Sequence, residues 1–71
     1  MEGLIERALE AIGQRDWESL RLVLHPYVRW QDGDTSIRGR TKVMGHLRVH
    51  PQVWPPGSWE VRDGQIYRWV R

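Results

Sequence analysis

"WEVRDGQIYRWVR", residues 59–71, is the stretch of sequence that decides the fold. Hydrophobic and polar residues alternate on both sides of Asp63-Gly64, and both residues of this pair tolerate the positive φ angles of a two-residue hairpin turn. We therefore predict an antiparallel hairpin in which Val61 pairs with Ile66.

Both faces of the predicted hairpin carry large hydrophobic side chains. The register also pairs Glu60 with Tyr67 and Trp59 with Arg68. One face then holds Trp59, Val61, Ile66, Arg68 and Val70, and the other holds Glu60, Arg62, Gln65, Tyr67 and Trp69. An antiparallel sheet with one face in water does not need apolar residues on both faces. We therefore expect the second face to contact another subunit.

Three helices are predicted before the hairpin. Residues 2–13 form the first, because its hydrophobic residues recur at helical spacing: Leu4, Ile5, Ala8, Leu9 and Ile12. Asp16 is the predicted N-cap of the second, which ends at Pro26 because proline lacks the backbone N–H. The third is "GRTKVMGHLRVH", residues 39–50, and "PQVWPPGS" after it is a linker.

A strand separates the second helix from the third. "YVRWQD", residues 27–32, alternates with period two, "DGD" is a turn, and "TSIR" is a short return strand. The order is therefore helix, helix, strand, helix, hairpin. This order predicts an α+β fold over the single domain 1–71, with the helices on one face of a small antiparallel sheet.

Composition limits the class of protein. The 71 residues include no cysteine, so there are no disulfides and no thiolate metal sites. Domains of this size bury only roughly 60% of their unfolded surface and are marginally stable alone. The net charge of +2 comes from 11 basic and 9 acidic residues, and this small excess argues against nucleic acid as a partner. No apolar run suits a membrane span or a signal peptide, so we expect a cytoplasmic protein.

Three segments resemble the nuclear transport factor 2-like superfamily, in particular its SnoaL-like branch. They are "ALEAIGQRDWESLRLVLHPYVRW", "WQDGDTSIRGRTKVMGHL" and "VRDGQIYRW". The resemblance implies a cystatin-like α+β fold, in which a curved sheet wraps round a helix to form a conical pocket. Family members have more strands before the closing hairpin, so this chain resembles a truncated member. Its pocket is expected to be shallow, open or completed by a partner.

Asp32 is the first catalytic candidate, because it stands where ketosteroid isomerases of this superfamily place their proton-abstracting acid. Trp30 and Val28 on the same strand face offer the apolar surroundings that raise a carboxyl pKa. The oxyanion-stabilising tyrosine of those enzymes falls near Ala8, which has no donor. The alternative is that Asp32 simply ends the strand and begins the turn.

Two other groups of polar residues are candidates for a functional site. Asp32, Arg40 and Asp34 resemble the Asp-Arg-Asp group of the superfamily's epoxide hydrolases, although Arg40 also suits a helix start. His46 and His50 are spaced i, i+4, so they lie on one side of the third helix. Two histidines at this spacing can chelate a metal, but no HExxH pattern accompanies them. We therefore interpret them either as polar residues at a pocket edge or as histidines at the core boundary with satisfied hydrogen bonds. We predict no metal and no cofactor.

These observations favour a small-molecule-binding protein or vestigial enzyme with an apolar pocket, acting as a homodimer. The predicted pocket residues are Trp17, Val28, Trp30, Val43, Leu47 and Trp59, with Asp32, His46 and His50 as catalytic candidates. The predicted dimer interface is the sheet face away from the helices, with Tyr27, Arg29, Tyr67 and Trp69. One alternative is an isomerase, cyclase or hydrolase that uses Asp32 as acid/base on a hydrophobic polycyclic or terpenoid-like substrate. Another is a dimerisation module without a ligand.

Overall fold

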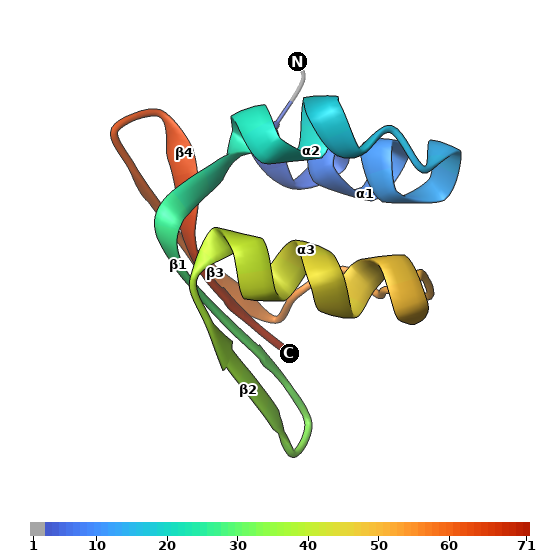
Figure 1. The fold of residues 1–71 in the computed structure, drawn as a ribbon. Coiled ribbons are helices and arrows are strands. Elements are labelled where there is room, and N and C mark those ends of the chain that lie inside the picture. Colours follow the sequence, from blue (N-terminus) through green and yellow to red (C-terminus); the bar gives the residue numbers. More distant parts are fainter. Residues whose placement is uncertain (1–2) are drawn as a thin grey trace.

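The computed structural model describes residues 3–71 and confirms the α+β class. Helices cover one face of a four-stranded sheet (Figure 1). The predicted start of the first helix at Glu2 lies outside the described residues. The elements are α1 (Leu4–Gln14), α2 (Trp17–Val23), β1 (Leu24–Asp32), β2 (Thr35–Arg38), α3 (Arg40–Val49), β3 (Ser58–Arg62) and β4 (Gln65–Val70).

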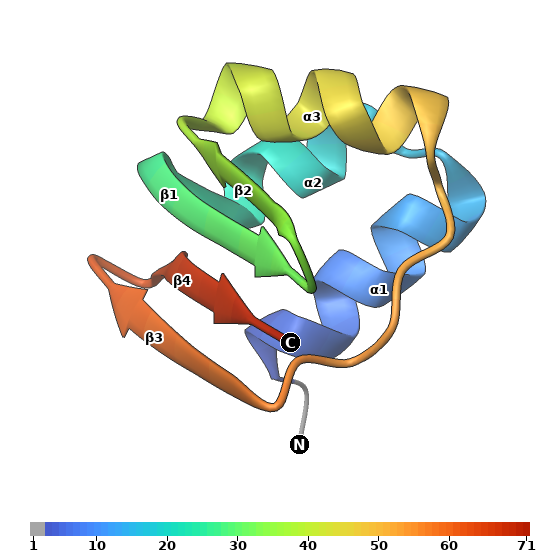
Figure 2. The same ribbon diagram turned by 90° about the horizontal axis from the view of Figure 1, so that it is seen from below.

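The C-terminal strand β4 lies inside the sheet and not at its edge. The strand order is β2-β1-β4-β3, so β4 has a neighbour on each side (Figure 2). It pairs antiparallel with β3 but parallel with β1, which makes the sheet mixed and not purely antiparallel. The first and last strands of the chain are therefore held together at the centre of the fold.

Pro26 does not end the second helix as predicted. The helix α2 stops at Val23, and Leu24 is already extended, with φ −96° and ψ 133°. Pro26 lies within β1, where the pairing with β4 is interrupted between Leu24 and Arg29. Proline is tolerated there because no ladder hydrogen bond needs its missing N–H.

The hairpin turn is confirmed. Asp63 and Gly64 have φ angles of 55° and 73°, as a two-residue turn of this type requires. Val61 pairs with Ile66 as predicted. The local sequence of the turn is thus sufficient to set the two pairs nearest to it, Arg62 with Gln65 and Val61 with Ile66.

Beyond that pair the predicted register is wrong. The register shifts between Glu60 and Val61, so Glu60 lies opposite Arg68 and Trp59 lies opposite Trp69. The extra residue on β4 is Tyr67, which makes this irregularity a β-bulge. Trp69 is therefore turned onto the same side of the sheet as Ile66.

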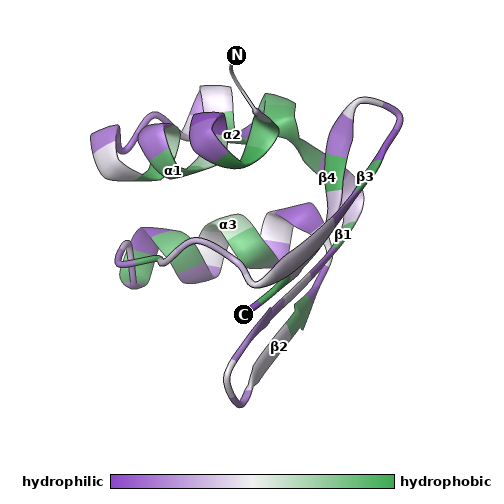
Figure 3. Cartoon of the chain, turned by 180° about the vertical axis from the view of Figure 1, so that it is seen from behind, coloured by the Kyte–Doolittle hydropathy of each residue, from purple (hydrophilic) through white to green (hydrophobic). Residues whose placement is uncertain are grey.

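The core lies between the helices and the sheet, and Trp69 belongs to it. The rings of Trp30 and Trp69 stack with centroids 4.6 Å apart and planes 12° apart. Trp69 is 0% exposed, so its predicted place in a dimer interface is wrong. The buried residues are Ala8, Ala11, Ile12, Leu20, Val23, Leu24, Val28, Trp30, Val43, Met44, Leu47, Ile66 and Trp69. Hydrophilic and hydrophobic residues alternate along the helices and strands around this core (Figure 3).

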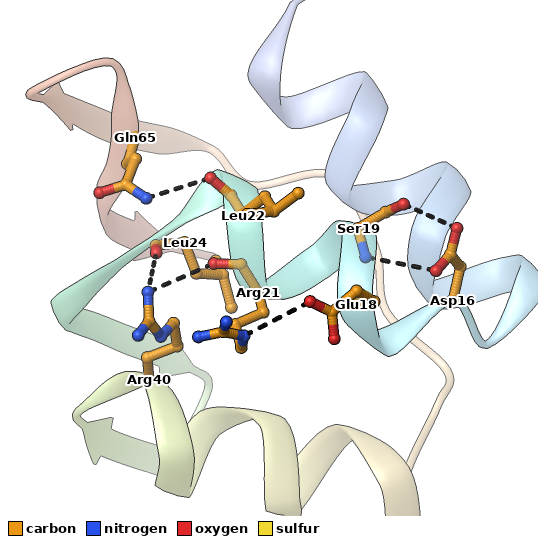
Figure 4. A network of polar contacts seen from close by, with 8 residues as sticks. All are labelled: Asp16, Glu18, Ser19, Arg21, Leu22, Leu24, Arg40 and Gln65. Carbon is orange, nitrogen blue, oxygen red and sulfur yellow. Dashed lines mark hydrogen bonds and ion pairs between the residues drawn. The ribbon is translucent and has the colours of Figure 1, made fainter.

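Polar contacts fix both ends of α2 (Figure 4). Asp16 caps the helix as predicted, accepting hydrogen bonds from the Ser19 backbone N–H at 3.2 Å and from its hydroxyl at 2.7 Å. These hydrogen bonds lower the pKa of the Asp16 carboxyl below its usual value. At the other end, Gln65 Nε2 donates to the Leu22 carbonyl at 3.1 Å and links α2 to β4.

Candidate functional site

The predicted catalytic residues do not form one site. Asp32 ends β1, its side chain is 29% exposed, and its carboxylate lies 3.6 Å from the guanidinium of Arg71. His46 and His50 contact each other on α3, with ring centroids 5.2 Å apart. Within residues 3–71, no hydrogen bond or ion pair joins Asp32 to either histidine, and no group of three or more His, Cys, Asp or Glu residues could hold a metal ion.

Arg40 has a structural role. Its Nη1 lies 3.4 Å from the carbonyl oxygens of both Arg21 and Leu24, where α2 passes into β1 (Figure 4). Asp34 lies in the exposed turn after β1. The Asp-Arg-Asp arrangement suggested by the sequence is therefore not assembled.

Most residues of the predicted pocket fill the core. Val28, Trp30, Val43 and Leu47 are at most 1% exposed, so they pack against one another and do not line an open pocket. Their inward direction is as predicted, but a chain of this size uses its interior for its own core. Trp17 is partly buried, with the Arg48 guanidinium 5.9 Å from its ring centre.

Trp59, the remaining predicted pocket residue, lies in an apolar hollow. Trp59 lies opposite Trp69, and Val61 lies opposite Ile66. Because Trp69 and Ile66 are buried in the core, Trp59 and Val61 also point to the helix side of the sheet. Each is nevertheless 51% exposed. This α1–β3 hollow has a volume of ≈ 400 Å³ and is lined by Gly3, Leu4, Ile5, Glu6, Pro55, Pro56, Trp59 and Val61.

The sequence alone did not reveal the other lining residues of the α1–β3 hollow. In the sequence, Leu4 and Ile5 belong to the hydrophobic face of the predicted first helix, and Pro55 and Pro56 belong to the predicted linker. The approach of the linker to the first turn of α1 is a tertiary contact between distant segments. The one local signal was the hydrophobic face of the hairpin, which carries Trp59 and Val61.

The outer face, on the side of the sheet away from the helices, is basic and not apolar. Tyr27 is 74% exposed there, but Trp69 is absent from this face. Arg29 lies opposite Arg38 on one side and opposite Arg68 on the other. The outer face consists of Tyr27, Arg29, Gln31, Ser36, Arg38, Ser58, Glu60, Arg62, Tyr67, Arg68 and Val70.

Comparison of the chain with family models, with curated proteins and with solved structures found no significant match. Among residues 3–71, no helix is both long enough and apolar enough to cross a membrane.

Proposed function

We propose that this chain is a small-molecule-binding protein that takes an apolar ligand in the α1–β3 hollow and acts as a homodimer. One observation carries the proposal: Trp59 and Val61 point to the helix side of the sheet and yet remain half exposed. An indole and two proline rings offer flat apolar surfaces to a ligand. The volume of ≈ 400 Å³ falls within the range of small-molecule sites, about 300–1,000 Å³.

The chemistry of the hollow favours binding over catalysis. Among the described residues that line it, one has an ionisable side chain: Glu6, which is exposed in the first turn of α1. General acid–base catalysis requires a group within hydrogen-bond reach of the reacting proton. Asp32, His46 and His50 do not line this hollow, and Asp32 is paired with Arg71. The positions of Asp32, His46 and His50 away from the hollow therefore favour a small-molecule-binding protein without catalytic residues at its ligand site over an isomerase or hydrolase.

Trp59→Ala is expected to weaken binding of the neutral hydrophobic fluorophore N-phenyl-1-naphthylamine by about tenfold, or ~1.4 kcal/mol. The variant removes the largest apolar surface of the hollow. The measurement is a fluorescence titration at constant protein concentration. Trp54→Ala is the matched control, since Trp54 is 59% exposed but lies outside the hollow. Equal binding by wild type and Trp59→Ala, or an equal loss in Trp54→Ala, contradicts the proposal.

The free edge of β3 supports the homodimer better than the outer face does. All five residues of β3 are exposed, and exposed sheet edges readily pair with another strand. If two copies pair antiparallel about Val61, Glu60 of each copy lies opposite Arg62 of the other. The second copy would also border the α1–β3 hollow, as the truncated sheet suggests. Dimerisation through the outer face would instead bring two sets of arginines together.

Glu60→Arg is expected to weaken the dimer about tenfold, because it converts two attractive cross-strand pairs into repulsive ones. The double variant Glu60→Arg/Arg62→Glu restores opposite charges across the edge and is expected to regain the affinity. Sedimentation velocity over a dilution series measures both. A wild-type chain that stays monomeric, or a double variant no better than the single one, argues against pairing at β3.

A further inference from the structure

Three arginines lie side by side on the outer face. Arg38 of β2, Arg29 of β1 and Arg68 of β4 are register partners across three neighbouring strands. Neighbouring strands are about 4.8 Å apart, so this arginine row spans about 10 Å. Like charges directly opposite each other destabilise a sheet. The arginine row therefore lowers the stability of the sheet, and core packing gives no reason for three arginines at these positions.

Two members of the arginine row have no acidic partner in the described part of the chain. Arg68 Nη1 lies 3.5 Å from the Glu60 carboxylate, with both side chains about half exposed. Arg29 and Arg38 make no ion pair with any carboxylate among residues 3–71. Both side chains are exposed, so their charges are available to an anion from solution.

Aromatic rings accompany the arginine row. Tyr27 precedes Arg29 by two residues on β1, and its ring is mostly in solvent. Tyr67 is more enclosed: the Arg62 guanidinium lies 4.2 Å from its ring centre, and His25 meets it edge-on at 5.2 Å. Tyr27 is therefore the ring with an open surface for stacking.

Two shallow hollows flank the arginine row, and both are lined by Arg29 and Arg38. One has a volume of ≈ 310 Å³ and is lined by Tyr27, Arg29, Arg38, Gly39 and Tyr67. The other, of ≈ 200 Å³, is lined by Arg29, Trp30, Gln31, Ser36, Arg38, Arg68 and Val70. The first hollow thus combines arginines with the ring of Tyr27. The second combines arginines with the amide of Gln31 and the hydroxyl of Ser36.

We propose that the outer face binds single-stranded nucleic acid. The arginine row contacts consecutive phosphates, a base stacks on Tyr27, and Gln31 and Ser36 meet base edges. Flat sheet surfaces with rings and cations suit unpaired bases, whose faces are open, whereas a duplex hides them. An anionic membrane fits less well, because this face offers no aliphatic side chain that is largely exposed for insertion. The site lies on the opposite side of the sheet from the α1–β3 hollow, so it does not depend on the function proposed above.

The first test is fluorescence anisotropy with a labelled oligothymidylate of about twelve nucleotides, within the usual site size of such proteins. For three phosphate contacts, the logarithm of the association constant should fall with the logarithm of salt concentration with a slope of roughly −2. Arg29→Gln should weaken binding at least tenfold and reduce this slope by about 0.7. Lys42→Gln removes the same charge from the exposed surface of α3 and should leave binding unchanged.

The second test separates the bases from the phosphates. Tyr27→Ala should weaken binding without changing the salt slope, because stacking releases no counterions. The proposal is overturned if inorganic polyphosphate or a duplex of equal length binds as tightly as the oligothymidylate. It is also overturned if the protein binds phosphatidylserine vesicles but no oligonucleotide, or if Lys42→Gln weakens binding as much as Arg29→Gln. Thermal unfolding monitored by circular dichroism should show that Arg29→Gln melts no lower than wild type, which excludes misfolding as the cause.

Discussion

A chain that ends after Gly64, and so lacks β4, is expected not to fold. The strand β4 lies between β1 and β3, so its loss leaves backbone hydrogen-bonding groups unpaired on both neighbours. It also removes Ile66 and Trp69, which are 0% exposed in the core. A 71-residue protein has a free energy of unfolding of roughly 4–10 kcal/mol in all. The loss of a central strand with two core residues is expected to cost more free energy than this.

The matched control ends after Val70 and removes Arg71 alone. Arg71 contributes its exposed ion pair with Asp32, a contact of its guanidinium with the Trp54 ring at 5.6 Å, and one hydrogen bond from its N–H to the Gln31 carbonyl at 3.0 Å. Its loss should lower the free energy of unfolding by about 1 kcal/mol. Far-UV circular dichroism and urea unfolding distinguish the two truncated chains. A cooperative unfolding transition in the chain without β4 would show that β4 is peripheral.

Local signals explain why the elements could be predicted. Asp63-Gly64 sets the hairpin turn through the conformations that these two residues tolerate. Asp16 sets the start of α2, because its carboxylate accepts from the backbone N–H three residues later. Arg40 likewise begins α3, where the sequence placed a helix start. Each of these features depends on residues close together in the chain.

The sheet order could not be predicted in this way. The parallel pairing of β1 with β4 joins segments about 40 residues apart, for example Arg29 with Arg68, and no turn between them reveals it. Without this pairing, the three arginines of the row appear as isolated charges on separate strands. The sequence therefore suggested an apolar outer face and disfavoured nucleic acid.

The β-bulge did leave a trace in the sequence. Ile66 and Trp69 are three residues apart, so a regular strand would direct them to opposite faces. Applying strict alternation placed Trp69 outside, although a chain with few large apolar residues gains much from burying an indole. With Tyr67 as an extra residue in the strand, Ile66 and Trp69 can both face the core, and this bulge is present in the structure.

The candidate site was the least predictable part. The sequence correctly directs Val28, Trp30 and Leu47 inward, but it cannot show that neighbouring side chains fill the space. Asp32 was interpreted through its resemblance to a catalytic position, whereas its contact with Arg71 depends on how β4 enters the sheet. The surroundings of a residue are determined by tertiary packing. Here core side chains fill the space of the expected pocket, and the α1–β3 hollow lies elsewhere, beside β3.

Trp69→Ala is expected to lower the free energy of unfolding by about 3–5 kcal/mol, whereas Trp59→Ala lowers it by less than about 1 kcal/mol. The two tryptophans are register partners on the same side of the sheet, so they form a matched pair. They differ in burial, at 0% exposed for Trp69 and 51% for Trp59. Trp69→Ala leaves a cavity against the stacked ring of Trp30, while Trp59→Ala leaves only a wider surface hollow.

Trp69→Phe keeps the experiment interpretable if the alanine variant does not fold. The indole Nε1 of Trp69 is buried without a hydrogen-bond partner in the described part of the chain, which is unfavourable for the wild type. Phenylalanine removes this group and retains a stacked ring, so it should cost less than half as much as alanine. Urea unfolding gives the free energies, and exciton-coupled circular dichroism of the stacked indoles reports the loss of the Trp30–Trp69 contact. If Trp69 were on the outer face, as strict alternation along the strand requires, Trp69→Ala would leave stability nearly unchanged and would weaken self-association instead.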